Sequence, residues 1–301
     1  MPIKIVTDSS CDLMSALAHS KGVSVVPVHI GIGSHTYRDG LDLTPPELLA
    51  KLADPRLGGT ITTAHPTPQD FLEAYQALPA ECQILSIHPS SSLSGSYNAA
   101  LQARKLLPQG EERVWVVDSG SVSIGLALFV LEACEMIVAS PHLKVAEILP
   151  RLEELRPRLR LLFTASNLRS LARGGRVSQA ASRISSMLSV NYVFKYDGQK
   201  SIVAIAQTFD LDSALDIIVQ RLQADDLLTP IKRLYIGYTH NFHTSCRPSE
   251  AEEPSDLSSV FAQIYQKISA LNLHAEICHT ELGCAVTAHC GEDVLGVAYV
   301  G

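Results

Sequence analysis

The sequence predicts an α/β protein of two lobes: an N-terminal, mostly parallel sheet with flanking helices, and a C-terminal α+β lobe with a mixed sheet. In the first half, short β-rich runs alternate with helical patterns, which is typical of a parallel sheet covered by helices. After about residue 155 this alternation stops, and two β-rich runs flank Asp197-Gly198, a typical hairpin turn. The length of 301 residues accommodates two domains, expected at 1–157 and 158–301.

The first domain is expected to alternate strands with helices. Strands are predicted at 3–6, 23–30, 83–88 and 113–117, and helices at 13–20, 46–52, 68–78, 95–107 and 123–138. The start of the third helix is well marked, since Thr67 can cap it, Pro68 fits the first helical position and Asp70 lies in the first turn. Right-handed crossovers would bring the loops after the strands to one edge of the sheet, where ligands usually bind.

The second domain is expected to hold a partly antiparallel sheet. Its predicted strands are 159–164, 191–196, 201–208, 234–238, 274–279 and 294–300, and its main predicted helices are 211–222 and 257–271. Short helices and a Gly174-Gly175 turn are expected after the first of these strands. The polar segment 244–256, with two prolines and three glutamates, is expected to be a surface loop.

Composition excludes several classes of protein. A net charge of −7 argues against general nucleic-acid binding, which requires a basic surface. The N-terminus is polar within a few residues, unlike a signal peptide. Glu132 and Glu135 interrupt the longest apolar stretch, 124–139, so we expect a buried helix there and no stable membrane insertion. Seven irregularly spaced cysteines favour a reducing cytoplasm over a disulfide scaffold.

Two hydroxyl-rich segments are the strongest functional indication. They are 62–66 (TTAHP) and 90–97 (SSSLSGSY), and each is expected to follow a strand and lead into a helix. Hydroxyls and free backbone N–H groups at such turns can bind an anion such as a carboxylate. Thr63 and Ser94 are the candidate ligands, and Gly95 would let N–H groups approach the anion. The alternatives are that Thr63 merely caps the next helix and that the serines form a solvated loop.

A hydrolytic site is an alternative interpretation of the same residues. His289 could donate to a bound carboxylate, or it could act as a base on Ser94, with Asp8 or Asp118 orienting it. The sequence lacks the G-x-S-x-G motif of many serine hydrolases, so we favour ligand binding. A small-molecule sensor or a sugar- or phosphate-binding protein would share the anion loops but lack a long apolar cavity.

A metal site is a further alternative, with the candidate ligands Cys278, His279, Cys284, His289 and Cys290. It is disfavoured because the spacings of these residues match no zinc pattern.

Several motifs together resemble the DegV family, the fatty-acid-binding proteins of bacteria. The opening segment 6–13 (VTDSSCDL) is similar to the family's first motif. The other motifs occur along the chain in the same order as in the family. They are 37–40 (YRDG), 63–66 (TAHP), 86–88 (SIH), 93–97 (LSGSY), 117–119 (VDS), 171–176 (LARGGR) and His289 with Gly291. The resemblance spans the whole chain, and it implies two α/β lobes with a fatty acid between or within them.

The resemblance also implies roles for individual residues. Thr63 and Ser94 match the hydroxyls that bind the fatty-acid carboxylate, Gly95 offers its backbone, and His289 completes the head-group network. In well-understood members a separate ATP-dependent kinase converts the bound acid into an acyl phosphate, so the chain itself is expected to be no enzyme. No cofactor is implied other than the long-chain fatty acid as ligand.

The chain also departs from the family pattern. Ala64 and His65 stand where the family commonly has Ser-Gln, and Glu292-Asp293 replaces Pro-Gly after Gly291. The segment 207–210 replaces a stretch that often contains arginine, which bears on the kinase partnership. Arg173 and Arg176 retain the basic Gly-Gly turn and are the candidate residues for docking the kinase.

Overall fold

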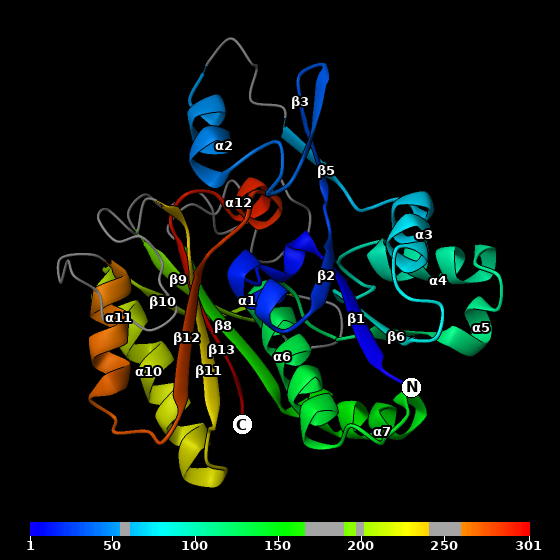
Figure 1. The fold of residues 1–301 in the computed structure, drawn as a ribbon. Helices are drawn as coiled ribbons and strands as arrows, with labels where there is room; N and C mark the ends of the chain where they lie inside the picture. The colour runs from blue at the N-terminus through cyan, green and yellow to red at the C-terminus, as the bar shows by residue number, and fades with distance from the viewer. Residues whose placement is uncertain (55–60, 166–189, 197–201, 241–259) are drawn as a thin grey trace.

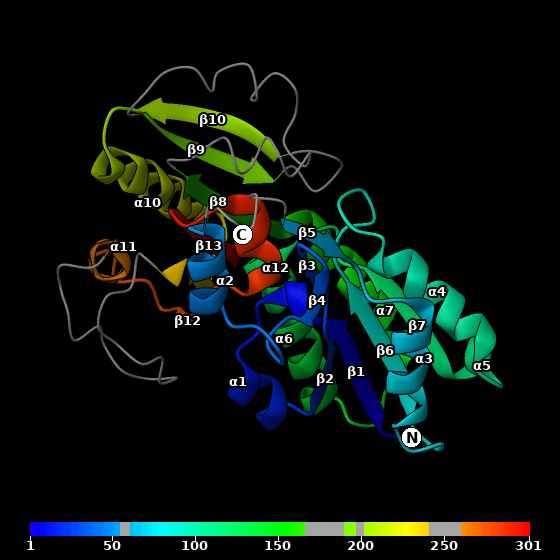
Figure 2. The same cartoon turned by 90° about the horizontal axis from the view of Figure 1, so that it is seen from above.

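Three sheets and the helices between them make up the described part of the chain (Figures 1 and 2). This computed structural model describes residues 1–54, 61–165, 190–196, 202–240 and 260–301. The predicted turn at Asp197-Gly198, the basic turn with Arg173 and Arg176, and the segment 244–256 lie outside the described residues.

The first sheet has four strands, all parallel, as the sequence predicts. Its order is β2-β1-β6-β7, with bounds Val23–Val26, Ile3–Asp8, Gln83–His88 and Val114–Asp118. Every residue of β6 is buried, as expected for a central strand with helices on both faces. On one face pack α3 (Pro68–Gln76) and α4 (Ser96–Leu106), and on the other α6 (Ser123–Ala139) and α7 (Val145–Leu155).

The predicted start of α3 is confirmed. The Thr67 hydroxyl accepts from the backbone N–H of Asp70 at 3.2 Å, and the Asp70 carboxylate accepts from the N–H of Thr67 at 2.7 Å. This reciprocal pair satisfies two N–H groups that a helix leaves unbonded at its start. Three further α-helices in the described residues of the first part of the chain are short: α1 Ser15–Ser20, α2 Pro45–Leu52 and α5 Gly110–Arg113.

The single strand predicted at 23–30 is wrong, because the chain changes sheet at Pro27. After β2 ends at Val26, β3 (His29–Ile32) joins a separate antiparallel sheet between β4 (His35–Arg38) and β5 (Ile61–Ala64). A proline has no N–H for a ladder hydrogen bond, which favours a break at this position. Thr63 therefore lies within β5, opposite Ile30, and not in the turn that we expected.

The third sheet is mixed, as the sequence predicts. Its order is β10-β9-β8-β13-β11-β12, with bounds Ile202–Thr208, Asn191–Tyr196, Leu159–Ala165, Val294–Val300, Arg233–Tyr238 and Glu276–Glu281. Only β11 and β12 pair in parallel within this sheet, and the other neighbours are antiparallel. One face is covered by α10 (Leu211–Leu228) and α11 (Val260–Ser269).

Helix α6 lies between the two large sheets (Figure 1). It packs against β1 of the parallel sheet and against β8, β11 and β13 of the mixed sheet. Nearly all of its first twelve residues are buried, as expected for a helix that is apolar on every side. The prediction of a buried helix is thus confirmed, and one apolar core joins both sheets. The boundary between 157 and 158 stays a prediction.

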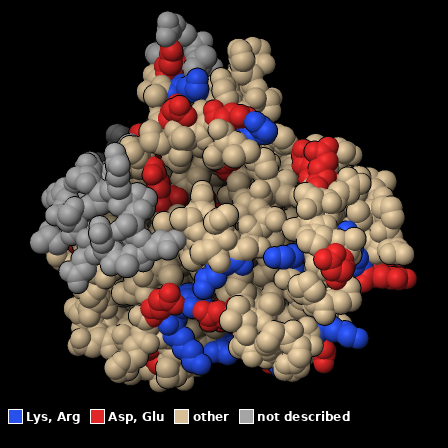
Figure 3. Space-filling model, viewed as in Figure 1, with Lys and Arg blue, Asp and Glu red and all other residues tan. Residues whose placement is uncertain are grey.

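A cluster of ion pairs connects the end of α6 to the mixed sheet. Arg233, at the start of β11, contacts Glu132 at 3.1 Å, Glu276 at 2.6 Å and Glu135. On the face shown in Figure 3, basic and acidic side chains are interspersed in this way. In the part of the chain that the structure describes, none of the helices combines the length and apolarity needed to cross a membrane.

The sequence analysis did not predict the last helix. This helix, α12 (Cys284–Cys290), lies between the strands predicted at 274–279 and 294–300, which form β12 and β13. This helix, from the end of the chain, packs against α2, β3 and β5 near the beginning. Its position places His289 beside Thr63, 226 residues earlier in the sequence.

Candidate functional site

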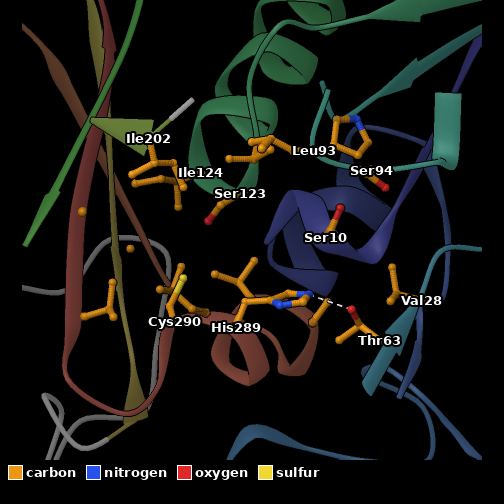
Figure 4. A pocket seen from close by; sticks show the side chains of 18 of the residues that line it. Ser10, Val28, Thr63, Leu93, Ser94, Ser123, Ile124, Ile202, His289 and Cys290 are labelled. Atoms are coloured by element: carbon orange, nitrogen blue, oxygen red, sulfur yellow. Dashed lines mark hydrogen bonds between the residues drawn. The ribbon is translucent and has the colours of Figure 1, made fainter. Parts of the chain in front are cut away.

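A cavity of about 400 Å³ lies where α12, α6, β5, the loop before α4 and the mixed sheet meet (Figure 4). This volume is within the range of small-molecule binding sites. Hydroxyl groups and two imidazoles gather at one end, and apolar side chains line most of the remainder. In Figure 4, Thr63, Ser94, Ser10 and His289 lie together, with Ile124 and Ile202 across the cavity.

Thr63 and His289 are directly bonded. The Thr63 Oγ1 lies 2.6 Å from Nε2 of His289, a hydrogen bond slightly shorter than the usual range for nitrogen and oxygen. Strand β5 directs Thr63 into the cavity, and the last turn of α12 carries His289 to the same point. The structure therefore brings together these two predicted residues.

Ser94 and Gly95 line the same cavity at the start of α4. The Ser94 hydroxyl lies 3.1 Å from the hydroxyl of Ser96 and accepts from the Ser96 N–H at 3.3 Å. Gly95 precedes the helix with an ordinary φ of −79°. A Cβ on Gly95 would lie 2.3 Å from the ring of His65, so the glycine leaves space for that ring. All four predicted ligand residues thus border one cavity.

Ser10 is a further polar residue in this wall that the sequence analysis did not single out. Its hydroxyl and its backbone N–H both donate to the carboxylate of Asp8. Asp8 is completely buried. Burial alone would raise the pKa of its carboxyl, but the interactions with His88, whose Nδ1 lies 3.9 Å from Asp8 Oδ2, and with Ser10 outweigh burial and lower that pKa. Ser10 belongs to the opening motif 6–13, but a motif alone does not indicate which hydroxyl faces a cavity.

The apolar part of the cavity passes over two strands of the mixed sheet. Gly237 on β11 and Gly296 on β13 lie directly opposite each other and both line the cavity. A Cβ on Gly237 would lie 2.6 Å from Cγ2 of Ile124 and 2.7 Å from Cδ2 of Leu282. These two glycines therefore remove side-chain bulk from the sheet at the place where the cavity crosses it.

The acids considered for a hydrolytic triad are engaged elsewhere. Asp8 accepts from Ser10, and Asp118 accepts from the backbone N–H groups of Ser91 and Gly120 at 3.0 and 2.8 Å. The hydroxyl bonded to Nε2 of His289 belongs to Thr63, while the Ser94 hydroxyl contacts Ser96. A Ser94–His289 nucleophile–base pair would require a different arrangement of these hydrogen bonds.

The cysteines and histidines considered as metal ligands form no metal site in the described part of the chain. Among the described residues, no group of three or more His, Cys, Asp or Glu side chains is arranged to hold a metal ion. Cys290 lines the cavity, and burial raises the pKa of its thiol to about 12. The thiol is thus protonated near neutral pH, which disfavours it as a nucleophile or metal ligand.

Comparisons with known proteins agree with this architecture. The model of a protein family described as "Uncharacterised protein, DegV family" matches residues 2–301. The chain belongs to the DegV family. A DegV domain-containing protein of Deinococcus radiodurans is 30% identical over 301 residues, covering 99% of this chain and 98% of the relative. The DegV fold expected from the sequence is thereby confirmed.

Solved structures of DegV proteins share the fold over the whole chain. A DegV family protein from Thermus thermophilus, whose structure concerns fatty acid binding, has a TM-score of 0.83 and 29% identity, with complete coverage of both chains. DegV of Bacillus subtilis, called a fatty acid binding protein, has a TM-score of 0.82 and 23% identity, covering 100% of this chain and 99% of its own. At the latter identity the likeness concerns the fold alone.

Proposed function

We propose that this DegV chain binds a long-chain fatty acid, with the carboxylate at Thr63, Ser94 and His289 and the acyl chain along the apolar walls. The observation that carries the proposal is the cavity, which is polar at one end and mainly apolar elsewhere. The Thermus thermophilus relative supports the choice of ligand, because its structure concerns fatty acid binding.

The head of the ligand would be held by hydrogen-bond donors. Thr63 and Ser94 offer hydroxyls, His289 offers an imidazole, and Gly95 lies where α4 begins. Backbone N–H groups at the start of a helix favour an anion, because the positive end of the helix dipole lies there. Hydrogen bonds to a charged group are stronger than neutral ones, so this end would fix the orientation of the ligand.

The tail would provide most of the affinity. At ~0.8 kcal/mol per buried methylene, fifteen methylenes contribute about 12 kcal/mol. Ordering the flexible chain and losing its free motion offset much of this. The binding free energy is therefore expected to depend on the length of the acyl chain, and loss of one head-group donor should weaken binding without abolishing it.

The test compares Thr63→Val and Ser94→Ala with wild type. Each change should weaken binding of palmitate or oleate by roughly 1–3 kcal/mol, because a charged acceptor loses a donor. Thr36→Val is the matched control, since Thr36 is an exposed threonine on β4 in the same small sheet. Titration calorimetry on delipidated protein measures the change. Full-strength binding by the Thr63→Val/Ser94→Ala double variant would refute these assignments.

The nature of the ligand is tested by mass spectrometry of lipid extracted from the purified protein. A stoichiometric C14–C18 acid supports the proposal. A sugar, a phosphate compound or no lipid would favour the sensor or sugar-binding alternative, although the mainly apolar walls argue against it. Labelling of Ser94 by a fluorophosphonate probe, with ester turnover that needs His289, would instead favour a hydrolase.

The proposal extends to presentation of the bound acid to a separate ATP-dependent kinase. Its support is the resemblance of the motifs and the basic pair Arg173 and Arg176. An Arg173→Ala/Arg176→Ala variant should bind fatty acid like wild type but yield less acyl phosphate with the kinase. An undiminished yield would exclude these arginines from docking.

A further inference from the structure

Two buried carboxylates, Asp12 and Asp39, hold the start of the helix that carries His289. The exposed fractions of these residues are 5% and 4%. Asp12 Oδ1 accepts from the backbone N–H of Gly283 at 2.8 Å, and Asp39 Oδ1 accepts from that of Cys284 at 3.0 Å. The N–H of Ala285 lies 3.4 Å from Asp39 Oδ2. The first N–H groups of α12 thus bond to residues 245 to 271 positions earlier in the chain.

This arrangement replaces an ordinary helix cap. The residue before α12 is Gly283, which has no side chain to accept from the first turn. A Cβ on Gly283 would lie 3.1 Å from Asp12 Oδ1 and 3.4 Å from Asp39 Oδ2. The absence of a side chain at 283 therefore allows both carboxylates to approach the backbone.

The second oxygen of each carboxylate forms a hydrogen bond that leads to another part of the cavity wall. The second oxygen of Asp12 accepts from the hydroxyl of Ser123, a cavity residue at the start of α6, at 2.5 Å. The second oxygen of Asp39 accepts from Ser9 at 2.8 Å, and the Ser9 oxygen accepts from the N–H of Val28, another cavity residue, at 3.0 Å. Both Asp12 and Ser123 have a positive φ, at 51° and 54°, a conformation that needs support from neighbours.

We infer that Asp12 and Asp39 are positioning residues of the binding site: they hold α12 against α6 and β3 so that His289 meets Thr63. On α12, Ala285, Val286, His289 and Cys290 face the cavity, so a shift of the helix start moves all four. The inference rests on the proposed function for the role of the site in fatty acid binding. The placement of His289 can be measured without any ligand.

The experiment compares Asp12→Asn and Asp39→Asn with wild type. An amide keeps the size of the side chain but has one acceptor oxygen in place of two, so it cannot accept both from the start of α12 and from Ser123 or Ser9. The ¹⁵N shifts of the His289 imidazole in delipidated protein report its bond to Thr63, and Thr63→Val gives the shifts for the broken bond. We expect both Asn variants to move toward Thr63→Val and to weaken palmitate binding about tenfold.

Asp210→Asn is the matched control. Asp210 caps α10, accepting from the N–H of Ser213 at 2.7 Å, and does not line the cavity. This variant should lower the melting temperature without changing the His289 shifts or the affinity. Unchanged His289 shifts and affinity in both Asp12→Asn and Asp39→Asn, with only a lower melting temperature, would overturn the inference.

A second variant covers the case in which the Asn proteins do not fold. Gly283→Ala keeps every charged and hydrogen-bonding group but pushes both carboxylates away from the helix start. It should shift the His289 resonances in the same direction, and unchanged resonances would again overturn the inference. If wild type binds no palmitate or oleate, the proposed function fails, whereas the His289 shifts still decide the positioning role.

Discussion

At the scale of single residues, one hydrogen atom decides how Thr63 can bind a carboxylate. The Thr63 hydroxyl carries one hydrogen, and its oxygen lies 2.6 Å from Nε2 of His289. If Nε2 lacks a hydrogen, the hydroxyl must donate to the ring and can only accept from a ligand. Because a carboxylate only accepts, Thr63 can donate to it when Nε2 of His289 carries a hydrogen and donates to the threonine.

We therefore predict that Nε2 of His289 is protonated in the complex with a fatty acid. The ¹⁵N spectrum of the palmitate complex should show a protonated Nε2. His289→Ala should weaken binding by roughly 1–3 kcal/mol, because the Thr63 hydroxyl loses the partner that directs its hydrogen toward the carboxylate. A bare Nε2 in the complex, or unchanged affinity in His289→Ala, would contradict this arrangement. Thr36→Val again serves as the control variant.

At the scale of elements, the glycine pair of β11 and β13 should set the room for the acyl chain. Gly237→Ala places a methyl group within 2.7 Å of Ile124 and Leu282 side chains, whereas the closest atom to a Cβ on Gly296 is Cβ of Phe163 at 3.2 Å. We predict that Gly237→Ala weakens binding of a C18 acid more than that of a C14 acid, by roughly 1–3 kcal/mol. Gly296→Ala should have a smaller effect.

Titration calorimetry with C14, C16 and C18 acids checks this prediction. The melting temperature of the delipidated variants separates a narrowed cavity from a damaged sheet. Equal losses for all three acids would argue that the glycine pair acts on the head group or on folding and not on the tail.

The elements that the sequence predicted well have local causes. Thr67, Pro68 and Asp70 are adjacent in the sequence and together define the start of α3. The apolar pattern of α6 similarly predicts burial, because it extends around the whole helix. The four candidate ligand residues line one cavity, while their role in binding stays a prediction.

The elements that were missed depend on distant contacts or on weak local patterns. Strand β5 is four residues long and forms only because it pairs with β3. Helix α7 contains Pro150, which disfavours a helix interior, and was not predicted. Helix α12 is short and apolar, and its first turn bonds to Asp12 and Asp39, which local sequence does not reveal.

At the scale of the whole molecule, the cavity depends on contacts between the beginning and the end of the chain. Helix α6 fills the space between the two large sheets, and α12 returns to the small sheet near the N-terminus. Asp12 lies at the point where these two helices begin. Its ionisation should therefore be coupled to the folding of the whole structure and not only to one loop.

Stability is predicted to fall as pH rises from about 4 to about 7. Burial raises the pKa of Asp12 to about 7, outweighing the hydrogen bonds from Ser123 and Gly283 that lower it, while the nearby Asp39 and Asp8 raise it further. In the unfolded chain the carboxyl has an ordinary pKa near 3.8. Between these values the folded state holds more protons than the unfolded state, so each rise in pH favours unfolding.

The size of this effect should be on the order of 2–4 kcal/mol across that pH range, with no further loss from Asp12 above it. The pKa of Asp39 is also raised, mainly by burial, and contributes with the same sign, whereas the lowered pKa of Asp8 acts with the opposite sign below pH 4. Denaturant unfolding at several pH values measures the slope, which Asp12→Asn should reduce. Asp210→Asn should change the slope only at the acid end of this range, because the pKa of Asp210 is lowered by its hydrogen bonds with Ser213. If the unfolding free energy of Asp12→Asn changed with pH as steeply as that of wild type, Asp12 would be ionised throughout this pH range. The start of α12 would then be bound by a carboxylate that is always charged.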